Sequence, residues 1–302
     1  MTPKTILPLG EVLWDVFPDG PRFGGAPANF ACAAAELGRE RVRVALASAV
    51  GRDELGDRAR RTLEERGVDL ARLETSDHPT GRVDVELDAA GRASYTFLAD
   101  TAWDHLAWSE ALAAAAGRAD VICFGTLGQR SVASQQAIHR AVASASADCL
   151  RVLDINLRPP YWDRDVVLES LPLANVLKLN DEELPILAGL LDLSGPEDDI
   201  LRAILGRYSF HLIALTRGAN GSLLQRADGE RSELPGVAVT VVDTVGAGDS
   251  FTAALALGLS HEMPLGAIHR WAADVAAFVC TQAGGTPAFP PRLRLTEVLA
   301  SP

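Results

Sequence analysis

The chain has 302 residues, of which 48% are hydrophobic and 23% are charged, and its formal net charge is −12. An apolar fraction of this size can bury a large core, which excludes an intrinsically disordered protein. Charged or turn residues interrupt each apolar run well before the roughly 18 residues that a membrane-spanning helix needs. The acidic balance also argues against nucleic-acid binding through neutralised phosphates.

The cysteines point to a reducing compartment. All of them lie in apolar stretches, and no two form a C-x-x-C pair, so we interpret them as small core residues: Cys32, Cys123, Cys149 and Cys280. The first twenty residues lack the sustained apolar stretch and cleavage site of a secretory signal. We therefore expect a cytoplasmic protein.

Short β-branched runs alternate with longer helical segments along most of the chain. Strands are predicted at Ile6–Leu9, Val42–Ala49, Val121–Phe124, Val152–Ile155, Val176–Leu179 and Leu212–Thr216. Helices are predicted at Pro27–Leu37, Glu54–Arg66, Ser131–Ser144, Glu182–Leu190, Asp198–Arg207 and Phe251–Leu259. Strands that are apolar on both faces and separated by helices indicate a mostly parallel sheet covered on each side.

One segment breaks this alternation. Arg82–Asp88 alternates polar and apolar residues, residues 89–91 supply a turn, and Ser94–Phe97 continues the alternation. Such a hairpin either extends the sheet edge or forms a lid over the active site. We favour the lid, because residues 11–23 offer further extended pieces. We expect a single domain, residues 1–302, with a lid from about 11–23 and 80–100, and a homodimer that covers the apolar face of the lid.

The sharpest motif runs from Asp243 to Phe251. Gly246 and Gly248 allow a tight turn that directs successive N–H groups at one point, and the following helix makes this point an anion site suited to a phosphoryl group. Asp249 is either a helix cap or a carboxylate directed at a substrate hydroxyl. The P-loop and dinucleotide-binding patterns are both absent from the sequence.

A second motif comes near the N-terminus. Gly24 and Gly25 allow the close approach of a small polar ligand, and Asn29 offers a donor and an acceptor to hydroxyl groups. Asp15 follows an apolar strand, where it can bind sugar hydroxyls or cap a turn. Ordinary strand-to-helix turn chemistry explains the same residues.

A third motif places Asn180 and Glu183 on one helical face. Their oxygens suit Mg²⁺ held through water, and the same spacing is equally that of a helix capping box. None of the six histidines is spaced for a metal pair. His261-Glu262 lacks the second histidine of a zinc-protease motif.

Together these motifs resemble the ribokinase-like, or PfkB-type, carbohydrate kinase family, which includes ribokinase, fructokinase and adenosine kinase. The string Asp243–Asp249 matches the C-terminal signature of that family, residues 24–29 match its Gly-Gly motif, Asn180-x-x-Glu183 matches its N-x-x-E element, and Thr216-Arg217-Gly218 resembles its T-x-G strand end. Three local segments are most similar to bacterial fructokinases: residues 25–29, the D-x-N-x-R-x-x-x-W segment at 154–162, and Ala102-Trp103-Asp104.

The resemblance implies a ribokinase-like three-layer α/β/α fold and an ATP-dependent sugar kinase, with fructose as the first candidate substrate. It implies that Asp249 is the base and that Gly246, Ala247 and Gly248 form the anion hole. A carboxylate at a helix N-terminus is expected to stay ionised at neutral pH. The alternatives are 2-keto-3-deoxygluconate, another small sugar as in ribokinase, or a catalytically idle ligand-binding relative.

The resemblance also implies the ligand contacts. The sugar would be held by Asp15, Gly24, Gly25, Asn29 and Arg158, although Arg158 could instead approach the phosphates. The nucleotide site would be lined by Thr216, Gly218, Asn180 and Gly285. Glu183 would support Mg²⁺ through water. In some members of the family the carbonyl at the position of Asp243 holds K⁺, so K⁺ is a further expected cofactor.

Overall fold

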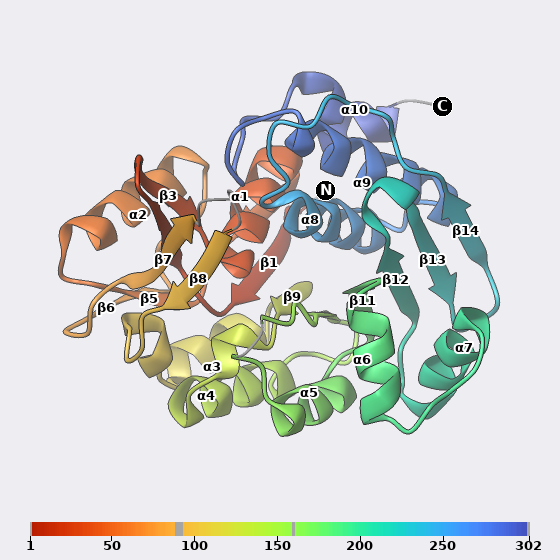
Figure 1. The fold of residues 1–302 in the computed structure, drawn as a ribbon, viewed down its shortest axis with the longest axis horizontal. Coiled ribbons are helices and arrows are strands. Elements are labelled where there is room, and N and C mark those ends of the chain that lie inside the picture. Colours follow the sequence, from red (N-terminus) through yellow and green to blue (C-terminus); the bar gives the residue numbers. More distant parts are fainter. Residues whose placement is uncertain (1, 88–92, 159–160, 301–302) are drawn as a thin grey trace.

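The structure, a computed structural model, describes residues 2–87, 93–158 and 161–300. Its centre is a sheet of eight strands in the order β14-β13-β12-β11-β10-β9-β1-β4 (Figure 1). From β12 to β4 the strands are parallel, and β13 and β14 are antiparallel. The bounds are β1 Lys4–Leu9, β4 Val42–Val44, β9 Val121–Phe124, β10 Leu150–Asp154, β11 Val176–Asn180, β12 Leu212–Thr216, β13 Ser222–Arg226 and β14 Arg231–Leu234.

Helices cover both faces of this sheet. Neighbouring strand residues point to opposite faces, so Ile6 packs into one buried cluster and Leu7 into the other. The first cluster includes side chains of α1 Ala26–Gly38, α2 Glu54–Glu65, α8 Ala247–Ser260, α9 Leu265–Cys280 and α10 Leu295–Ala300. The second includes those of α3 Glu110–Ala116, α4 Val132–Ala143, α5 Arg164–Ser170, α6 Glu183–Leu190 and α7 Glu197–Arg207. The predicted three-layer α/β/α architecture is confirmed.

A smaller sheet stands apart from the large one. It has the order β3-β2-β7-β8, with bounds β2 Leu13–Phe17, β3 Gly20–Gly24, β7 Gly81–Leu87 and β8 Ala93–Phe97. In its register Asp15 is the partner of Val83, and Val83 is the partner of Phe97. Residues that are partners across neighbouring strands share a face, so these three side chains lie on one side of the small sheet. The turn predicted at 89–91 lies outside the described residues.

The predicted strand Val42–Ala49 is wrong, because the chain changes sheets within it. β4 ends at Val44, and β5 (Ser48–Gly51) pairs with β6 (Leu73–Ser76) in a separate two-stranded sheet. A continuous apolar run does not show where its pairing partner changes. The sequence analysis also missed several described elements: α3, α5, α9, α10, β6, β13 and β14. Among the described residues, no helix combines the length and apolar character needed to cross a membrane.

Candidate active site

The candidate active site lies at the carboxyl ends of the parallel strands, the edge where open α/β sheets bind ligands. Asp154 ends β10 and Thr216 ends β12. The first turns of α1 and α8 reach the same edge, since Asn29 contacts Asp249 and Thr252 contacts Asp154. Motif residues from both ends of the chain are therefore brought together here.

The N-terminus of α8 forms the centre of the site. The helix begins at Ala247, earlier than the Phe251 predicted from sequence, so Gly248 and Asp249 belong to its first turn. Gly246 has φ +74°, and a Cβ atom there would lie 2.5 Å from the carbonyl oxygen of Gly285. No side chain caps this helix end, although the N–H of Ala247 donates to the carbonyl oxygen of Thr244 at 3.3 Å. A helix N-terminus without a side-chain cap offers its remaining first-turn N–H groups to an anion.

Asp249 joins the two glycine motifs. Its Oδ2 atom accepts a hydrogen bond of 2.8 Å from Nδ2 of Asn29. Desolvation raises the pKa of Asp249 to about 6, and the negative charge of Asp154 adds to the shift. Burial therefore outweighs the lowering expected at a helix N-terminus. The carboxylate remains mostly ionised at pH 7, with a proton affinity close to that of a working general base.

A buried lysine that sequence reasoning missed lies beneath the N-terminus of α8. Nζ of Lys178 is 3.0 Å from Oδ1 of Asp154, and Oγ1 of Thr252 donates to Oδ2 of the same carboxylate at 2.9 Å. Burial alone would lower the pKa of Lys178, but the charges of Asp154, Glu183 and neighbours outweigh it and raise the pKa. Nζ also lies 3.2 Å from where a Cβ of Gly248 would stand. A fixed positive charge thus supports the first turn of α8.

Glu11 is a second missed residue. It is 3% exposed, and its Oε1 atom accepts a hydrogen bond of 3.2 Å from the N–H of Ala26. Burial raises the pKa of Glu11 to about 7, with Asp249 among the charges that contribute. Glu11 and Asp249 line the same small cavity. The only sequence signal was an acidic residue two positions after the end of the first strand.

The predicted sugar-binding residues come together on the small sheet and the start of α1. A Cβ at Gly24 would lie 2.9 Å from Oδ2 of Asp15, and one at Gly25 would lie 2.6 Å from the carbonyl oxygen of Glu11. Gly25, with φ +101° and a backbone atom in the way, needs glycine, whereas a side chain at Gly24 would displace the Asp15 carboxylate. Burial raises the pKa of Asp15 to about 6, while the nearby charge of Arg158 opposes the shift.

The third motif forms the hydrogen bonds of a capping box. Oε2 of Glu183 accepts from the N–H of Asn180 at 2.8 Å, and Oδ1 of Asn180 accepts from the N–H of Glu183 at 2.8 Å. Oε1 of Glu183 accepts from the N–H of Leu157 at 2.8 Å. The box therefore also holds the loop that carries Arg158, whose charge acts on Glu11, Asp15 and Asp249.

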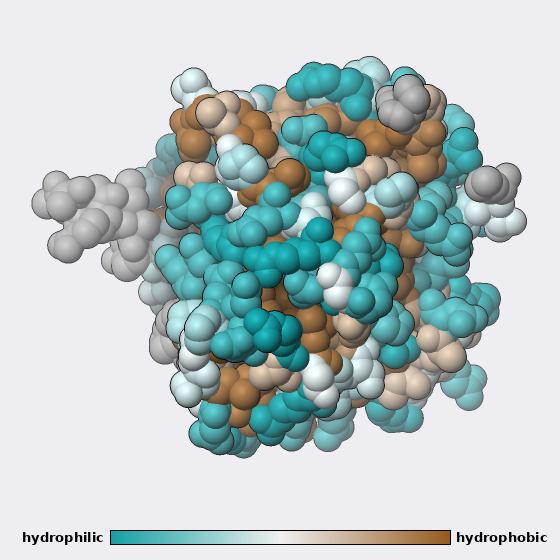
Figure 2. Space-filling model, turned by 90° about the vertical axis from the view of Figure 1, so that its right-hand side faces the viewer, coloured by the Kyte–Doolittle hydropathy of each residue, from teal (hydrophilic) through white to brown (hydrophobic). Residues whose placement is uncertain are grey.

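Another group of residues lies beside α8 at the C-terminal end of the chain. The carboxylate of Asp243 accepts from the N–H groups of Val245 and Gly284, each at 3.0 Å. Gly285 packs against both Gly246 and Asn29. Several valines in the segment between β14 and α8 are exposed: Val237, Val239, Val241 and Val242. Figure 2 shows the side of the molecule that carries β13 and β14, where hydrophobic patches lie among hydrophilic residues.

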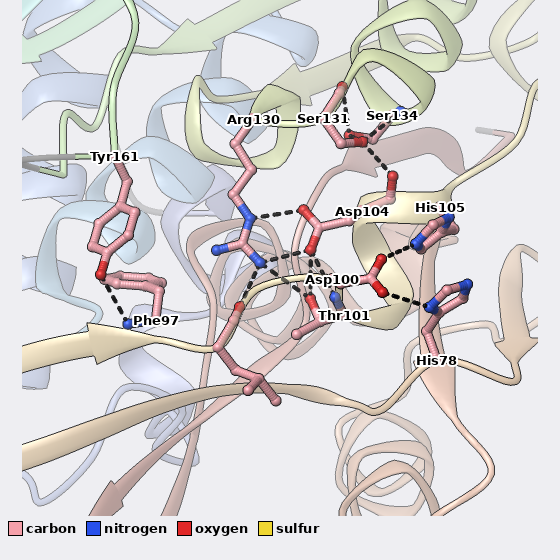
Figure 3. Close-up of polar contacts among 11 residues, drawn as sticks. His78, Phe97, Asp100, Thr101, Asp104, His105, Arg130, Ser131, Ser134 and Tyr161 are labelled. Carbon is pink, nitrogen blue, oxygen red and sulfur yellow. Dashed lines mark hydrogen bonds and ion pairs between the residues drawn. The ribbon is translucent and has the colours of Figure 1, made fainter.

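The fructokinase-like stretch at 102–104 anchors the small sheet rather than lining the site. Nε of Arg130 is 2.7 Å from Oδ1 of Asp104, and Nη2 is 2.6 Å from Oδ2 (Figure 3). The guanidinium of Arg130 also lies over the ring of Trp103. Nη2 also donates to the carbonyl oxygen of Leu98 at 2.7 Å, just after β8. This network is largely buried.

Two histidines outside the site, which their sequence spacing did not connect, lie side by side in the structure. The rings of His78 and His105 lie 3.5 Å apart, and both face the carboxylate of Asp100 (Figure 3). Their separation in the sequence gave no sign of this arrangement.

Comparisons with known proteins identify the family of this chain. Residues 19–292 match the family model described as pfkB family carbohydrate kinase. The fructokinase of Klebsiella pneumoniae is 33% identical over 279 residues, which cover 85% of each chain. The crystal structure of the Xylella fastidiosa fructokinase with bound ATP has a TM-score of 0.82 and 25% identity, with 98% of this chain and 97% of that chain covered.

A solved structure of a ribokinase-type protein supports the fold. The chain titled putative Ribokinase II from E. coli is 22% identical, with a TM-score of 0.82 and 98% of each chain covered. The predicted ribokinase-like fold is thereby confirmed, as is the resemblance on which it rested. The chain therefore belongs to the pfkB family of carbohydrate kinases and is a sugar kinase.

Proposed function

We propose that this sugar kinase transfers the γ-phosphoryl group of MgATP to a hydroxyl of fructose. The hydrogen bond between Asn29 and Asp249 carries the proposal, because it joins a hydroxyl-binding amide and a basic carboxylate at the N-terminus of α8. The fructokinase relatives and the ATP-bound relative support the choice of substrates.

In the proposed reaction Asp249 takes the proton of the sugar hydroxyl as that oxygen attacks the γ-phosphorus. A new P–O bond forms to the sugar, the bond to the β-phosphate oxygen breaks, and ADP leaves with that electron pair. The N–H groups of Gly246, Ala247 and Gly248 stabilise the charge on the transferring group, and Lys178 adds a positive charge from below. Such an arrangement lets an acidic protein handle a polyanionic substrate.

The sugar would lie between the small sheet and the body. Asp15, Gly24, Gly25, Asn29 and Arg158 would hold it. Phe97 shares the face of Asp15, and its backbone N–H donates to the hydroxyl of Tyr161 at 3.3 Å. We thus propose that residues 1–302 form one kinase domain in which the small sheet is the lid.

The nucleotide would lie on the side of α8 away from the sugar. Thr216, Gly218, Asn180 and Gly285 would line its site, with the exposed valines after β14 beside the adenine ring. Glu183 is 3% exposed, and each of its oxygens accepts a peptide N–H. The lone pairs that remain suit an outer-sphere contact with a Mg²⁺-bound water. When bound, Mg²⁺ neutralises charge on the ATP phosphates.

The loop at Asp243 would hold K⁺ through main-chain oxygens. The carboxylate bonds to Val245 and Gly284 fix the conformation of this loop. These bonds leave the carbonyl oxygen of Asp243 as the candidate ligand, and carbonyl oxygens suit a hard cation.

We also propose a homodimer formed through the lid, because Tyr95 on β8 is 55% exposed. A gel-filtration mass of 32.0 kDa would contradict it, since that is the mass of one chain. The four free cysteines fit a cytoplasmic location, where thiols stay reduced.

Release of ADP by the purified protein with MgATP tests the function. The panel contains fructose, 2-keto-3-deoxygluconate, ribose and adenosine. We expect kcat/KM for fructose to exceed the others by at least about tenfold, or about 1.4 kcal/mol of transition-state binding. If the enzyme prefers another compound of the panel, that compound replaces fructose as the proposed substrate. If no compound of the panel is phosphorylated, the proposed kinase activity is contradicted.

A further inference from the structure

A cluster of metal-ligating side chains lies at the base of the small sheet, outside the proposed active site. Nε2 of His105 is 2.7 Å from Oδ1 of Asp100, and Nδ1 of His78 is 3.5 Å from Oδ2 of the same carboxylate. The candidate ligand atoms all lie within 4.8 Å of one another. Figure 3 shows that each imidazole directs a nitrogen at the Asp100 carboxylate, which lies to one side of the two stacked rings. No other such group of three occurs among the residues that the structure describes.

The backbone that carries these side chains is fixed by hydrogen bonds. The N–H of Ala102 donates to the carbonyl oxygen of Pro79 at 2.8 Å, which joins the segment of His78 to that of Asp100. The side chain of Thr101 and that of Asp104 form a capping box around the short helix Ala102–His105. The three ligands therefore come from two segments that are held together before any ion binds, as a preorganised site requires.

We propose that His78, Asp100 and His105 bind a divalent transition-metal ion of the zinc class. Two imidazole nitrogens and one carboxylate oxygen are the protein ligands of an open tetrahedral zinc site, in which water takes the fourth position. The nitrogen-rich donor set selects Zn²⁺, Co²⁺ or Ni²⁺ over Mg²⁺, which prefers oxygen. The site is thus distinct from the proposed Mg²⁺ and K⁺ positions.

Binding requires a small rearrangement of the side chains. Bonds of about 2.0–2.1 Å in a tetrahedral site place ligand atoms about 3.3 Å apart. The two rings are stacked with an angle of 11° between their planes, so each must turn about its Cβ–Cγ bond before both lone pairs meet at one ion. The side chains of His78 and His105 are 38% and 41% exposed, which leaves them free to turn.

A bound ion would join the two ends of the lid hairpin. His78 precedes β7, and Asp100 and His105 follow β8. The metal would therefore connect the segment that enters the hairpin to the one that leaves it. We expect the ion to raise the melting temperature, because it binds the folded chain and not the separated ligands of the unfolded one.

Calorimetric titration of Zn²⁺ into untagged protein, without nucleotide or sugar, tests this proposal. We expect one ion per chain. We also expect His78→Ala and His105→Ala each to weaken Zn²⁺ binding by about 100-fold, which is the upper end of the loss seen when a residue that supports a metal ligand is removed. His211→Ala, an exposed histidine elsewhere, and Cys280→Ser, a partly exposed thiol, are matched controls that should bind as wild type.

Two further measurements keep the proposal falsifiable. Co²⁺ should give the visible absorption of a tetrahedral site in wild type but not in His105→Ala, and Mg²⁺ in equal concentration should leave Zn²⁺ bound. If an alanine variant has a lower melting temperature than the wild type without metal, the corresponding glutamine variant, His78→Gln or His105→Gln, is used in its place. Absence of saturable Zn²⁺ binding, or binding that survives loss of either histidine, would overturn the site.

Discussion

The side-chain amide of Asn29 donates a hydrogen bond to the carboxylate of Asp249 over 2.8 Å, although 220 residues separate them in sequence. Asn29 lies in the first turn of α1, and Asp249 lies in the first turn of α8. The amide favours the ionised carboxylate, while burial disfavours it. The balance leaves Asp249 ionised at neutral pH and basic enough to take a proton, which has consequences for rate, pH dependence and stability.

Replacing Asp249 with Asn should abolish most of the turnover and keep the fold. A positioned general base contributes about 10²–10⁴ in rate, so we expect kcat to fall by that factor while the far-UV circular dichroism stays unchanged. Asn29→Asp is a useful companion, because it should place two carboxylates in contact and raise the pKa of the pair. An Asp249→Asn variant within a few-fold of wild type would refute the assignment of the base.

The rate should fall in mild acid. Because the pKa of Asp249 is about 6, kcat/KM should decrease about tenfold for each pH unit below that value as the base becomes protonated. Glu11, whose pKa burial raises to about 7, is the competing explanation. Glu11→Gln should keep the acidic limb near pH 6 in a pH–rate profile, and loss of that limb would identify Glu11 as the titrating group instead.

The stability should depend on pH in the opposite sense. The folded-state pKa of Asp249 lies above its ordinary value of 3.8, so its contribution to stability is full below that value and is lost as the pH rises through about 6. Asp249→Asn removes this penalty and should be more stable than wild type by about 1–3 kcal/mol above pH 6. Urea unfolding at pH 5 and pH 8 measures the difference in the free energy of unfolding between the variant and the wild type. A difference that becomes smaller from pH 5 to pH 8 would contradict this prediction.

A single and a double variant can separate the structural role of Lys178 from its proposed catalytic role. Lys178→Met leaves Asp154 buried without its cation, which should cost about 3–5 kcal/mol of stability. Adding Asp154→Asn should restore most of that loss, because no unpaired charge remains. We expect kcat of the double variant to stay about 10²-fold low, since the charge under the anion site is still missing. Recovery of both stability and kcat would leave Lys178 a purely structural role.

Gly246 should tolerate no side chain. Alanine there would combine a left-handed backbone with a Cβ 2.5 Å from the carbonyl oxygen of Gly285, at a cost of about 2–4 kcal/mol. Gly189→Ala is the matched control, because nothing lies within 4 Å of its Cβ position in α6. It should gain about 0.5–1 kcal/mol. Equal melting temperatures for the two variants would show that the loop at Gly246 adapts.

The motifs could be predicted because each carries its chemistry within a few consecutive residues. The glycines around Asp249 and Asn29 were found in this way, and so was the alternation at 82–97 that marks the small sheet. Lys178 and Asp154 could not be found, because Asp154 ends one apolar strand and Lys178 lies in the middle of another. Only the pairing of β10 with β11 makes them neighbours. His78 and His105 were missed for the same reason, since the contact between their segments is tertiary.

The packing of Gly285 against both Gly246 and Asn29 has a consequence for how the enzyme matures. The turn at Gly246 rests on a loop that is synthesised after every strand of the large sheet. A nascent chain can therefore complete this sheet and still lack an ordered turn at the proposed phosphate site. Activity should therefore appear only after Gly285 has been synthesised and packed, and fragments that end before residue 284 should fold in part without becoming kinases.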